Sequence, residues 1–101
     1  YYIISNCTFN NITFDCEKLE KFIFIDCKFI NTKFNGNHIT DTIFDRCIFE
    51  ESEFNDNIFG KDVRYYDWTV STITLTGNTY TPEHIENGVN KFEAFVEESK
   101  E

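Results

Sequence analysis

The chain has 101 residues, enough for one small domain, and carries 9 Lys or Arg against 18 Asp or Glu, a formal net charge of −9. The acidic residues are spread along the chain, and the clustered basic residues that bind phosphate are missing, so we expect no nucleic-acid partner. Direct contact with an anionic membrane is disfavoured for the same reason, and no apolar run is long enough to span a bilayer.

Large apolar residues recur at every fifth position from Ile4 to Phe59. The series is Ile4, Phe9, Phe14, Leu19, Phe24, Phe29, Phe34, Ile39, Phe44, Phe49, Phe54 and Phe59. A spacing of five matches neither a helix face nor strand alternation. If the chain turns a corner every five residues, it forms square coils of twenty that stack about 4.8 Å apart, with the centre of each side pointing to the axis.

The repeat resembles that of the pentapeptide-repeat proteins, whose pattern centres on Leu or Phe with a small residue two positions before the centre. The best matches are CTFNN at 7–11, CKFIN at 27–31, TKFNG at 32–36, CIFEE at 47–51 and SEFND at 52–56. The resemblance implies an all-β solenoid, a right-handed quadrilateral β-helix of three to four coils, with residues 1–61 as its repeat domain. It does not imply one function, because one fold hosts many.

Glu17, Asn37 and Asn57 are twenty apart and occupy the small inward position of one side. Buried polar groups need hydrogen-bonding partners. We therefore expect this side to be distorted, or to admit water or backbone contacts at these residues.

Cys7, Cys27 and Cys47 are also twenty apart, which places them in an inward ladder on another side. Zinc sites use ligands that converge on one point, and parallel Cβ vectors do not suit a disulfide, so small buried thiols that fill the core are favoured over both alternatives. Cys16 falls at a corner, where it is the most accessible. The cysteines favour a reducing, cytoplasmic compartment.

Six isoleucines lie one position before or after a centre and should point outward on two adjacent sides. They are Ile3, Ile23, Ile25 and Ile43 on one side, and Ile30 and Ile48 on the next. A contiguous apolar patch needs a cover, which could be the chain's own C-terminal tail, further chain, a partner protein or a second copy.

After Phe59 the register breaks, but Val63, Trp68 and Ile73 restore the spacing of five. They predict that 62–80 forms an imperfect last coil and a connection, with Val63, Trp68 and Ile73 as its centres. Aromatic bulk near Trp68 would help to close the open end of the solenoid.

Residues 81–101 have the features of an amphipathic helix. Thr81 is the expected N-cap and Pro82 the first helical residue. Apolar residues then follow at spacings of four, three and four. We expect this helix to cap the C-terminal end of the solenoid or to lie on the isoleucine face, and dimerisation through it is the alternative.

Catalytic chemistry is not indicated. His38 and His84 are isolated from any nucleophile setting, and the glycines form no phosphate-binding loop. We expect no enzyme, no cofactor and no metal, but a non-catalytic module that binds a protein partner or a second copy of itself, as a possible homodimer. The isoleucines are the candidate contact residues.

Two other functions follow from resemblance. Quinolone-resistance members of the pentapeptide-repeat family mimic DNA and bind type II topoisomerase, but their rods are longer. Synaptic vesicle glycoproteins carry a similar Phe-centred, Cys-containing repeat region, which implies a luminal or extracellular recognition domain of a membrane protein.

Overall fold

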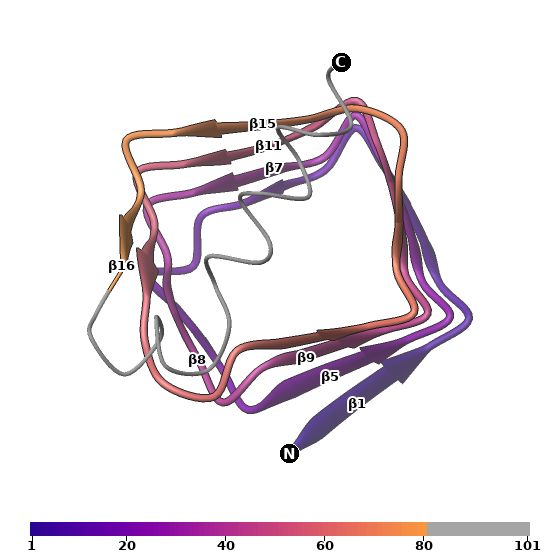
Figure 1. The fold of residues 1–101 in the computed structure, drawn as a ribbon, viewed down its shortest axis with the longest axis horizontal. Coiled ribbons are helices and arrows are strands. Elements are labelled where there is room, and N and C mark those ends of the chain that lie inside the picture. Colours follow the sequence, from indigo (N-terminus) through magenta and orange to yellow (C-terminus); the bar gives the residue numbers. More distant parts are fainter. Residues whose placement is uncertain (81–101) are drawn as a thin grey trace.

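The computed structural model describes residues 1–80, which form sixteen short β-strands and no helix. The strands form a four-coil solenoid with a square outline (Figure 1). This confirms the expected all-β quadrilateral solenoid. The helix expected over 81–101 lies outside the described residues.

Each side of the square is a four-stranded parallel sheet, with one strand from each coil. The first side contains β1 (Tyr2–Ser5), β5 (Phe22–Ile25), β9 (Ile43–Asp45) and β13 (Arg64–Tyr66). The second contains β2 (Thr8–Asn10), β6 (Lys28–Ile30), β10 (Ile48–Glu50) and β14 (Thr69–Val70). The third contains β3 (Thr13–Phe14), β7 (Lys33–Asn35), β11 (Ser52–Asn55) and β15 (Ile73–Thr76). The fourth contains β4 (Lys18–Glu20), β8 (His38–Thr40), β12 (Ile58–Phe59) and β16 (Thr79–Tyr80).

The centres of the sides form the core, as the spacing of five predicted. Phe34 pairs with Phe14 of the preceding coil and with Phe54 of the following coil, each twenty residues away in the sequence. The rings of Phe34 and Phe54 stack at 4.4 Å between centroids, with their planes 6° apart. Rings on neighbouring sides meet edge-on, as Phe24 and Phe29 do at 72°. The core therefore consists of stacked aromatic columns in contact across the corners.

Nearly every corner places one residue in the left-handed backbone region, the corner after Val70 being the exception within residues 1–80. These residues are Asn6, Asn11, Glu17, Lys21, Asp26, Asn31, Gly36, Asp41, Arg46, Glu51, Asp56, Asp62, Asp67 and Gly77. Most are Asn, Asp or Gly, the residue types that adopt positive φ at the lowest cost. A corner residue generally follows its centre by two positions, which explains the polar residues between the apolar centres.

The fourth coil corrects one expectation about the centres. The structure pairs Tyr65 with Phe44 and Leu75 with Phe54, so the centres of this coil include Tyr65, Val70 and Leu75, and the backbone of Tyr80 pairs with Phe59. Val63, Trp68 and Ile73 instead stand two positions before these centres. One extra residue between Phe59 and Tyr65 shifts the register, and Asp62 takes the corner conformation there.

The first coil forms an open end of the described solenoid. Each of its strands is the outermost strand of its sheet, so one edge of β1, β2, β3 and β4 faces no other strand within residues 1–80. Its centres Phe9 and Phe14 are half-buried, whereas their partners in the next coil, Phe29 and Phe34, are fully buried. Their extra exposure arises because, among the described residues, no coil packs on that side of the first coil.

Candidate interaction surface

The position two before each centre has a defined role in the structure. From the second coil on, where this residue is Cys, Thr, Ser or Asn, its side chain donates a hydrogen bond to the carbonyl oxygen of a centre in the preceding coil, generally 23 residues earlier. Thr32 Oγ1 donates to Phe9 O at 3.1 Å, and Asn57 Nδ2 donates to Phe34 O at 2.8 Å. The polar side chains at this position therefore provide hydrogen-bond donors for carbonyls of the centres in the preceding coil.

The buried asparagines extend this arrangement into a ladder. Asn57 Oδ1 accepts hydrogen bonds from the backbone N–H of Asn37 at 2.9 Å and from Asn37 Nδ2 at 3.2 Å. Asn78 accepts from Asn57 in the same way. The expected backbone contacts are confirmed, and β8 and β12 pair in register on this side.

Glu17 does not belong to this ladder, which corrects the sequence-based expectation. It is exposed and has a φ of 67°, because the corner after Phe14 falls one residue later than usual. Cys16 takes the ladder position instead, and its backbone N–H donates to Asn37 Oδ1 at 3.0 Å.

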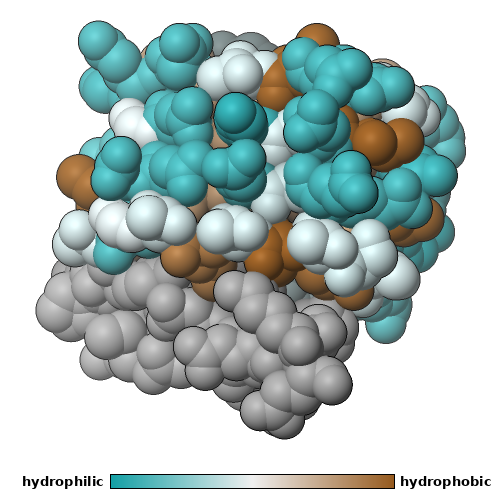
Figure 2. Space-filling view, turned by 90° about the horizontal axis from the view of Figure 1, so that it is seen from above, coloured by the Kyte–Doolittle hydropathy of each residue, from teal (hydrophilic) through white to brown (hydrophobic). Residues whose placement is uncertain are grey.

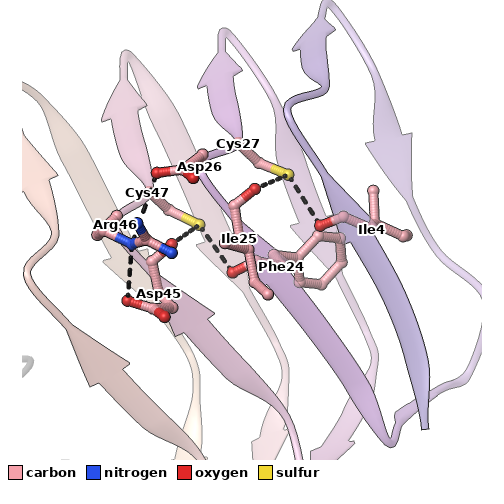
Figure 3. A network of polar contacts seen from close by, with 8 residues as sticks. All are labelled: Ile4, Phe24, Ile25, Asp26, Cys27, Asp45, Arg46 and Cys47. Carbon is pink, nitrogen blue, oxygen red and sulfur yellow. Dashed lines mark hydrogen bonds and ion pairs between the residues drawn. The ribbon is translucent and has the colours of Figure 1, made fainter.

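The cysteines occupy the same inward position on the second side. The Sγ atoms of Cys27 and Cys47 donate to the carbonyls of Ile4 and Phe24, at 3.4 and 3.3 Å (Figure 3). Burial raises the pKa of the Cys47 thiol from 9.0 to about 12 and raises that of Cys27 as well. Cys7 was expected in this ladder as a buried thiol but is exposed, because no coil lies above it in the described residues. Cys16 is exposed, as expected.

The outward isoleucines separate into one group and two single residues. Ile3, Ile23 and Ile43 are register partners across β1, β5 and β9, and Ile25 lies two residues along β5 from Ile23. We call these four residues the isoleucine strip. Ile3 is 66% exposed, and the other three are partly exposed, since neighbours in the column shield one another.

Ile30 and Ile48 lie on the second side among polar residues. Ile30 has Asn10 and Glu50 as register partners, and Ile48 has Lys28 and Thr69. The structure therefore brings together four of the six candidate residues and leaves these two apart.

A charged corner separates the two sides. Arg46 lies between Asp26 and Asp45, with its Nε 3.6 Å from an oxygen of Asp26 and 3.4 Å from one of Asp45 (Figure 3). Asp67 occupies the same corner one coil later. The isoleucine strip is thus bounded on this edge by three carboxylates and one guanidinium.

A shallow pocket of about 260 Å³ borders the opposite edge of the strip. It is lined by Tyr1, Asp41, Ile43, Asp62 and Arg64. Arg64 lies 3.5 Å from Asp62, and the hydroxyl of Tyr66 beside it helps to raise the pKa of the guanidinium. The spacing of twenty did not predict this pocket, because Asp41 and Asp62 are 21 residues apart and are aligned at one corner only by the extra residue between Phe59 and Tyr65.

The remaining sides have a different chemical character. The third side is mostly hydrophilic, as Figure 2 shows. On its surface Asn55 Nδ2 donates to Asn35 Oδ1 at 3.0 Å, and Lys33 lies 3.9 Å from Glu53. The fourth side has one exposed isoleucine, Ile58, whose register partners are His38 and Thr79.

Two further features bear on chemistry and location. Within residues 1–80, no three His, Cys, Asp or Glu side chains gather closely enough to hold a metal ion. The same residues contain no helix that could cross a membrane. His38, on β8, is exposed on the fourth side, away from the isoleucine strip.

Compared with known protein families and with curated proteins, the sequence gives no match.

Proposed function

We propose that this protein is a non-catalytic interaction module that binds another protein chain through the isoleucine strip. The observation that carries the proposal is the column of Ile3, Ile23 and Ile43, aligned in register on the outside of the solenoid. Outward positions on the other sides are mainly polar. Apolar side chains that gather on one outer face of a folded chain are typical of a binding surface.

The scaffold suits this role because it is pre-organised. Ile23 and Ile25 stand on either side of the fully buried Phe24, and Ile43 stands directly before the fully buried Phe44. Parallel pairing on both edges holds β5 in place. A rigid surface loses little conformational entropy on binding, so more of the apolar burial contributes to affinity.

We also propose that the chain is a pentapeptide-repeat protein with a right-handed coil. The spacing of five supports this assignment. Small Cys, Thr and Ser residues at the position two before many centres support it too. This assignment is consistent with the binding role but does not specify a partner.

The experiment is sedimentation equilibrium with urea unfolding on the wild type, Ile23→Lys and Ile43→Lys. Ile58→Lys is the matched control, because Ile58 is 43% exposed but lies on the fourth side. If the strip is free to bind, both strip variants fold with a free energy of unfolding within about 1 kcal/mol of the control.

Two other outcomes are informative. Dimers of the wild type and Ile58→Lys, with folded monomers of both strip variants, would support the proposal with a second copy as the partner. The proposal would be overturned if the strip variants were monomeric and their free energy of unfolding fell several kcal/mol further than that of Ile58→Lys. The strip would then be covered by its own chain.

A further inference from the structure

We propose that a second copy of this protein stacks on the first coil, so that the open ends of two solenoids meet head to head. This surface is distinct from the isoleucine strip and does not depend on the function proposed above. Three features of the open end support the pairing: its strand edges, the exposed side chains at the end of the core, and the absence of charge on three of its sides.

The first coil presents unpaired backbone groups along its strands. On β2, the carbonyl of Cys7 and the N–H of Asn11 bond to the second coil. Alternate residues of a parallel strand bond to opposite neighbours, so the backbone groups of Thr8 and Asn10 face the other way. Within residues 1–80 no strand lies on that side. Such an edge is a template for pairing with another strand.

Apolar side chains at the end of the core are exposed. Ile12 and Ile73 both stand two positions before a centre of the third side, yet Ile12 is 41% exposed and Ile73 only 2%. Tyr2 has the corresponding position on the first side and is 66% exposed, although its ring lies 5.2 Å from that of Phe22 between centroids. A coil stacked on this end would bury Ile12 and Tyr2, as the neighbouring coils bury Ile73.

The Cys7 thiol makes only part of the hydrogen bonding seen one coil later. Cys27 Sγ donates to Ile25 O in its own coil at 3.5 Å and to Ile4 O in the preceding coil at 3.4 Å. Cys7 Sγ donates to Ser5 O in its own coil at 3.4 Å, and within residues 1–80 it has no acceptor in another coil. A stacked copy can supply that acceptor.

The first three sides of the first coil carry no charged side chain, since residues 1–14 read YYIISNCTFNNITF. The same three sides of every later coil do carry charges. They are Asp26, Lys28 and Lys33 in the second coil, Asp45, Arg46, Glu50, Glu51 and Glu53 in the third, and Arg64 and Asp67 in the fourth. Charged residues and proline usually protect edge strands from pairing, and β1, β2 and β3 have neither.

A second copy matches this end better than a single extended segment does. One segment pairs with one edge, whereas another first coil presents four edges in the same square outline (Figure 1). Two-fold symmetry brings like surfaces together and makes the strands of the two copies antiparallel, a pairing at least as stable as the parallel one. Each copy has a net charge of −9, so repulsion is weakest where the uncharged sides meet.

The dimer should be weak, because only the end of one coil is covered in each copy. We expect a dissociation constant of roughly 0.1 mM, as for small transient interfaces. Salt should strengthen the dimer, since it screens the repulsion between two acidic chains and no ion pair holds the uncharged sides together.

The test is sedimentation equilibrium of the full chain from 10 μM to 1 mM, under reducing conditions, in 50 and 300 mM NaCl. We expect a monomer–dimer equilibrium whose dissociation constant falls at least twofold at the higher salt concentration. A dimer that salt weakens would overturn the inference.

The first variant places a charge on the open end. Ile12→Lys should raise the dissociation constant at least tenfold. Ile58→Lys is the matched control, because Ile58 is 43% exposed but lies on the fourth side of the third coil. Ile23→Lys alters the isoleucine strip. Both of these variants should dimerise within twofold of the wild type.

The second variant changes the edge without adding charge. Asn10→Pro removes a backbone N–H that faces the open edge. Asn10 precedes Asn11, which has a φ of 59°, and proline is favoured directly before such a residue in a type II turn. The variant should therefore fold, with the urea midpoint of the wild type, and should also raise the dissociation constant at least tenfold.

The other outcomes are decisive in the opposite direction. A wild type that is monomeric at 1 mM, dimers that persist in both end variants, or species larger than dimers would overturn the inference, because head-to-head pairing closes at two copies. Dissociation in Ile23→Lys alone would also overturn it and would support the isoleucine strip as the self-interface. Urea midpoints of both end variants far below that of Ile58→Lys would show that the end is covered by its own chain, which again overturns the inference.

Discussion

The side chain two positions before each centre determines how the corners are stabilised. Cys, Thr, Ser and Asn all serve at this position, because each can donate a hydrogen bond to a carbonyl of the preceding coil. Asn and Ser do more than donate, since Asn57 Oδ1 and Ser52 Oγ also accept from backbone N–H groups of that coil. The fourth side therefore depends on polar side chains that are almost completely buried.

The substitution Asn57→Ala should cost about 3 kcal/mol of unfolding free energy. It removes a donor to Phe34 O and leaves the backbone N–H and the amide of Asn37 without their acceptor in a buried site. Asn55→Ala is the control, since it removes an outward hydrogen bond to Asn35 that water can replace, and should cost less than about 1 kcal/mol. Urea unfolding measures both, and equal costs would contradict the role of the ladder.

The buried thiol of Cys47 should make stability fall at alkaline pH. Its pKa is raised to about 12 in the folded chain, from 9.0. Above pH 9 the unfolded chain releases a proton that the folded chain retains, so stability is full below pH 9 and declines as pH rises towards 12. At pH 10.5 the loss from this thiol is about 2 kcal/mol.

The measurement compares urea unfolding at pH 8 and pH 10.5, under reducing conditions, for the wild type and Cys47→Ser. Serine keeps the donor to Phe24 O, as Ser52 does towards Phe29 O, but does not titrate in this range. Between pH 8 and pH 10.5, the free energy of unfolding of the wild type should fall by about 2 kcal/mol more than that of the variant. Equal losses would show that this thiol does not control the alkaline limit.

For individual residues, the sequence predicted the inward columns but not every member of them. Cys27, Cys47, Asn37 and Asn57 occupy the positions that their spacing of twenty indicated. Glu17 has the same spacing but lies outside its column, because the corner conformation falls on it rather than on Cys16. The spacing counts residues and carries no information about which one adopts positive φ.

The strands and corners show how one inserted residue changes the fourth coil. Phe59 and Tyr65 are six residues apart instead of five, and all later strands follow the shifted register. Gly60 is the first residue after Phe59 in this longer interval. A Cβ there would come within 2.2 Å of Thr40 Cγ2. The absence of a side chain at Gly60 thus permits close approach to β8.

The substitution Gly60→Ala should therefore cost about 2 kcal/mol, since the added methyl overlaps that of Thr40. In a Thr40→Ser background, which lacks the Cγ2 methyl, the same substitution should cost about 1 kcal/mol less. Urea unfolding of the double-mutant cycle checks this coupling. Additive costs would show that the contact with Thr40 is not what requires glycine.

The sequence predicted the strands of the first three coils but misplaced those of the fourth. From 63 to 80, two interleaved series have a spacing of five, one with Val63, Trp68 and Ile73 and another with Tyr65, Val70 and Leu75. Both are apolar, so periodicity alone does not choose between them. Pairing with Phe44, Phe49 and Phe54 decides the matter, and that is a property of the assembled sheets.

Within residues 1–80 the chain forms a stack in which the strands of each coil pair only with those of neighbouring coils. Such stacks derive their stability from the interfaces between coils. The first coil has one such interface, whereas the second has two. The first coil should therefore open locally at lower cost than the second.

Hydrogen exchange should show this difference in matched corner amides. Asn11 N–H donates to Ile30 O at 3.1 Å, and Asn31 N–H donates to Glu50 O at 2.9 Å, so their hydrogen bonds are similar. We expect the protection factor of Asn31 to exceed that of Asn11 at least tenfold, measured by NMR at pH 6. Equal protection would indicate that the coils open together.

The sequence predicted the column of isoleucines in the strip, but it did not predict the charged corner that bounds the strip. The spacing of twenty placed Ile3, Ile23 and Ile43 in line, and the registers confirm it. The grouping of Ile30 and Ile48 with them did not allow for the charged corner at Arg46. Corner side chains project between two sides, and a pattern that assigns each residue to one side does not describe them.

The hydrogen bonds at the corners give the solenoid a polarity along its axis. In each such bond between successive coils the side chain belongs to the later coil, and the backbone group it serves belongs to the earlier one. A coil added after another brings the side chains that its predecessor requires, whereas a coil added before it must rely on side chains already present. Tandem duplication of a twenty-residue unit thus copies both the strands and the groups that join them, so an array of this kind can lengthen without redesign of its corners.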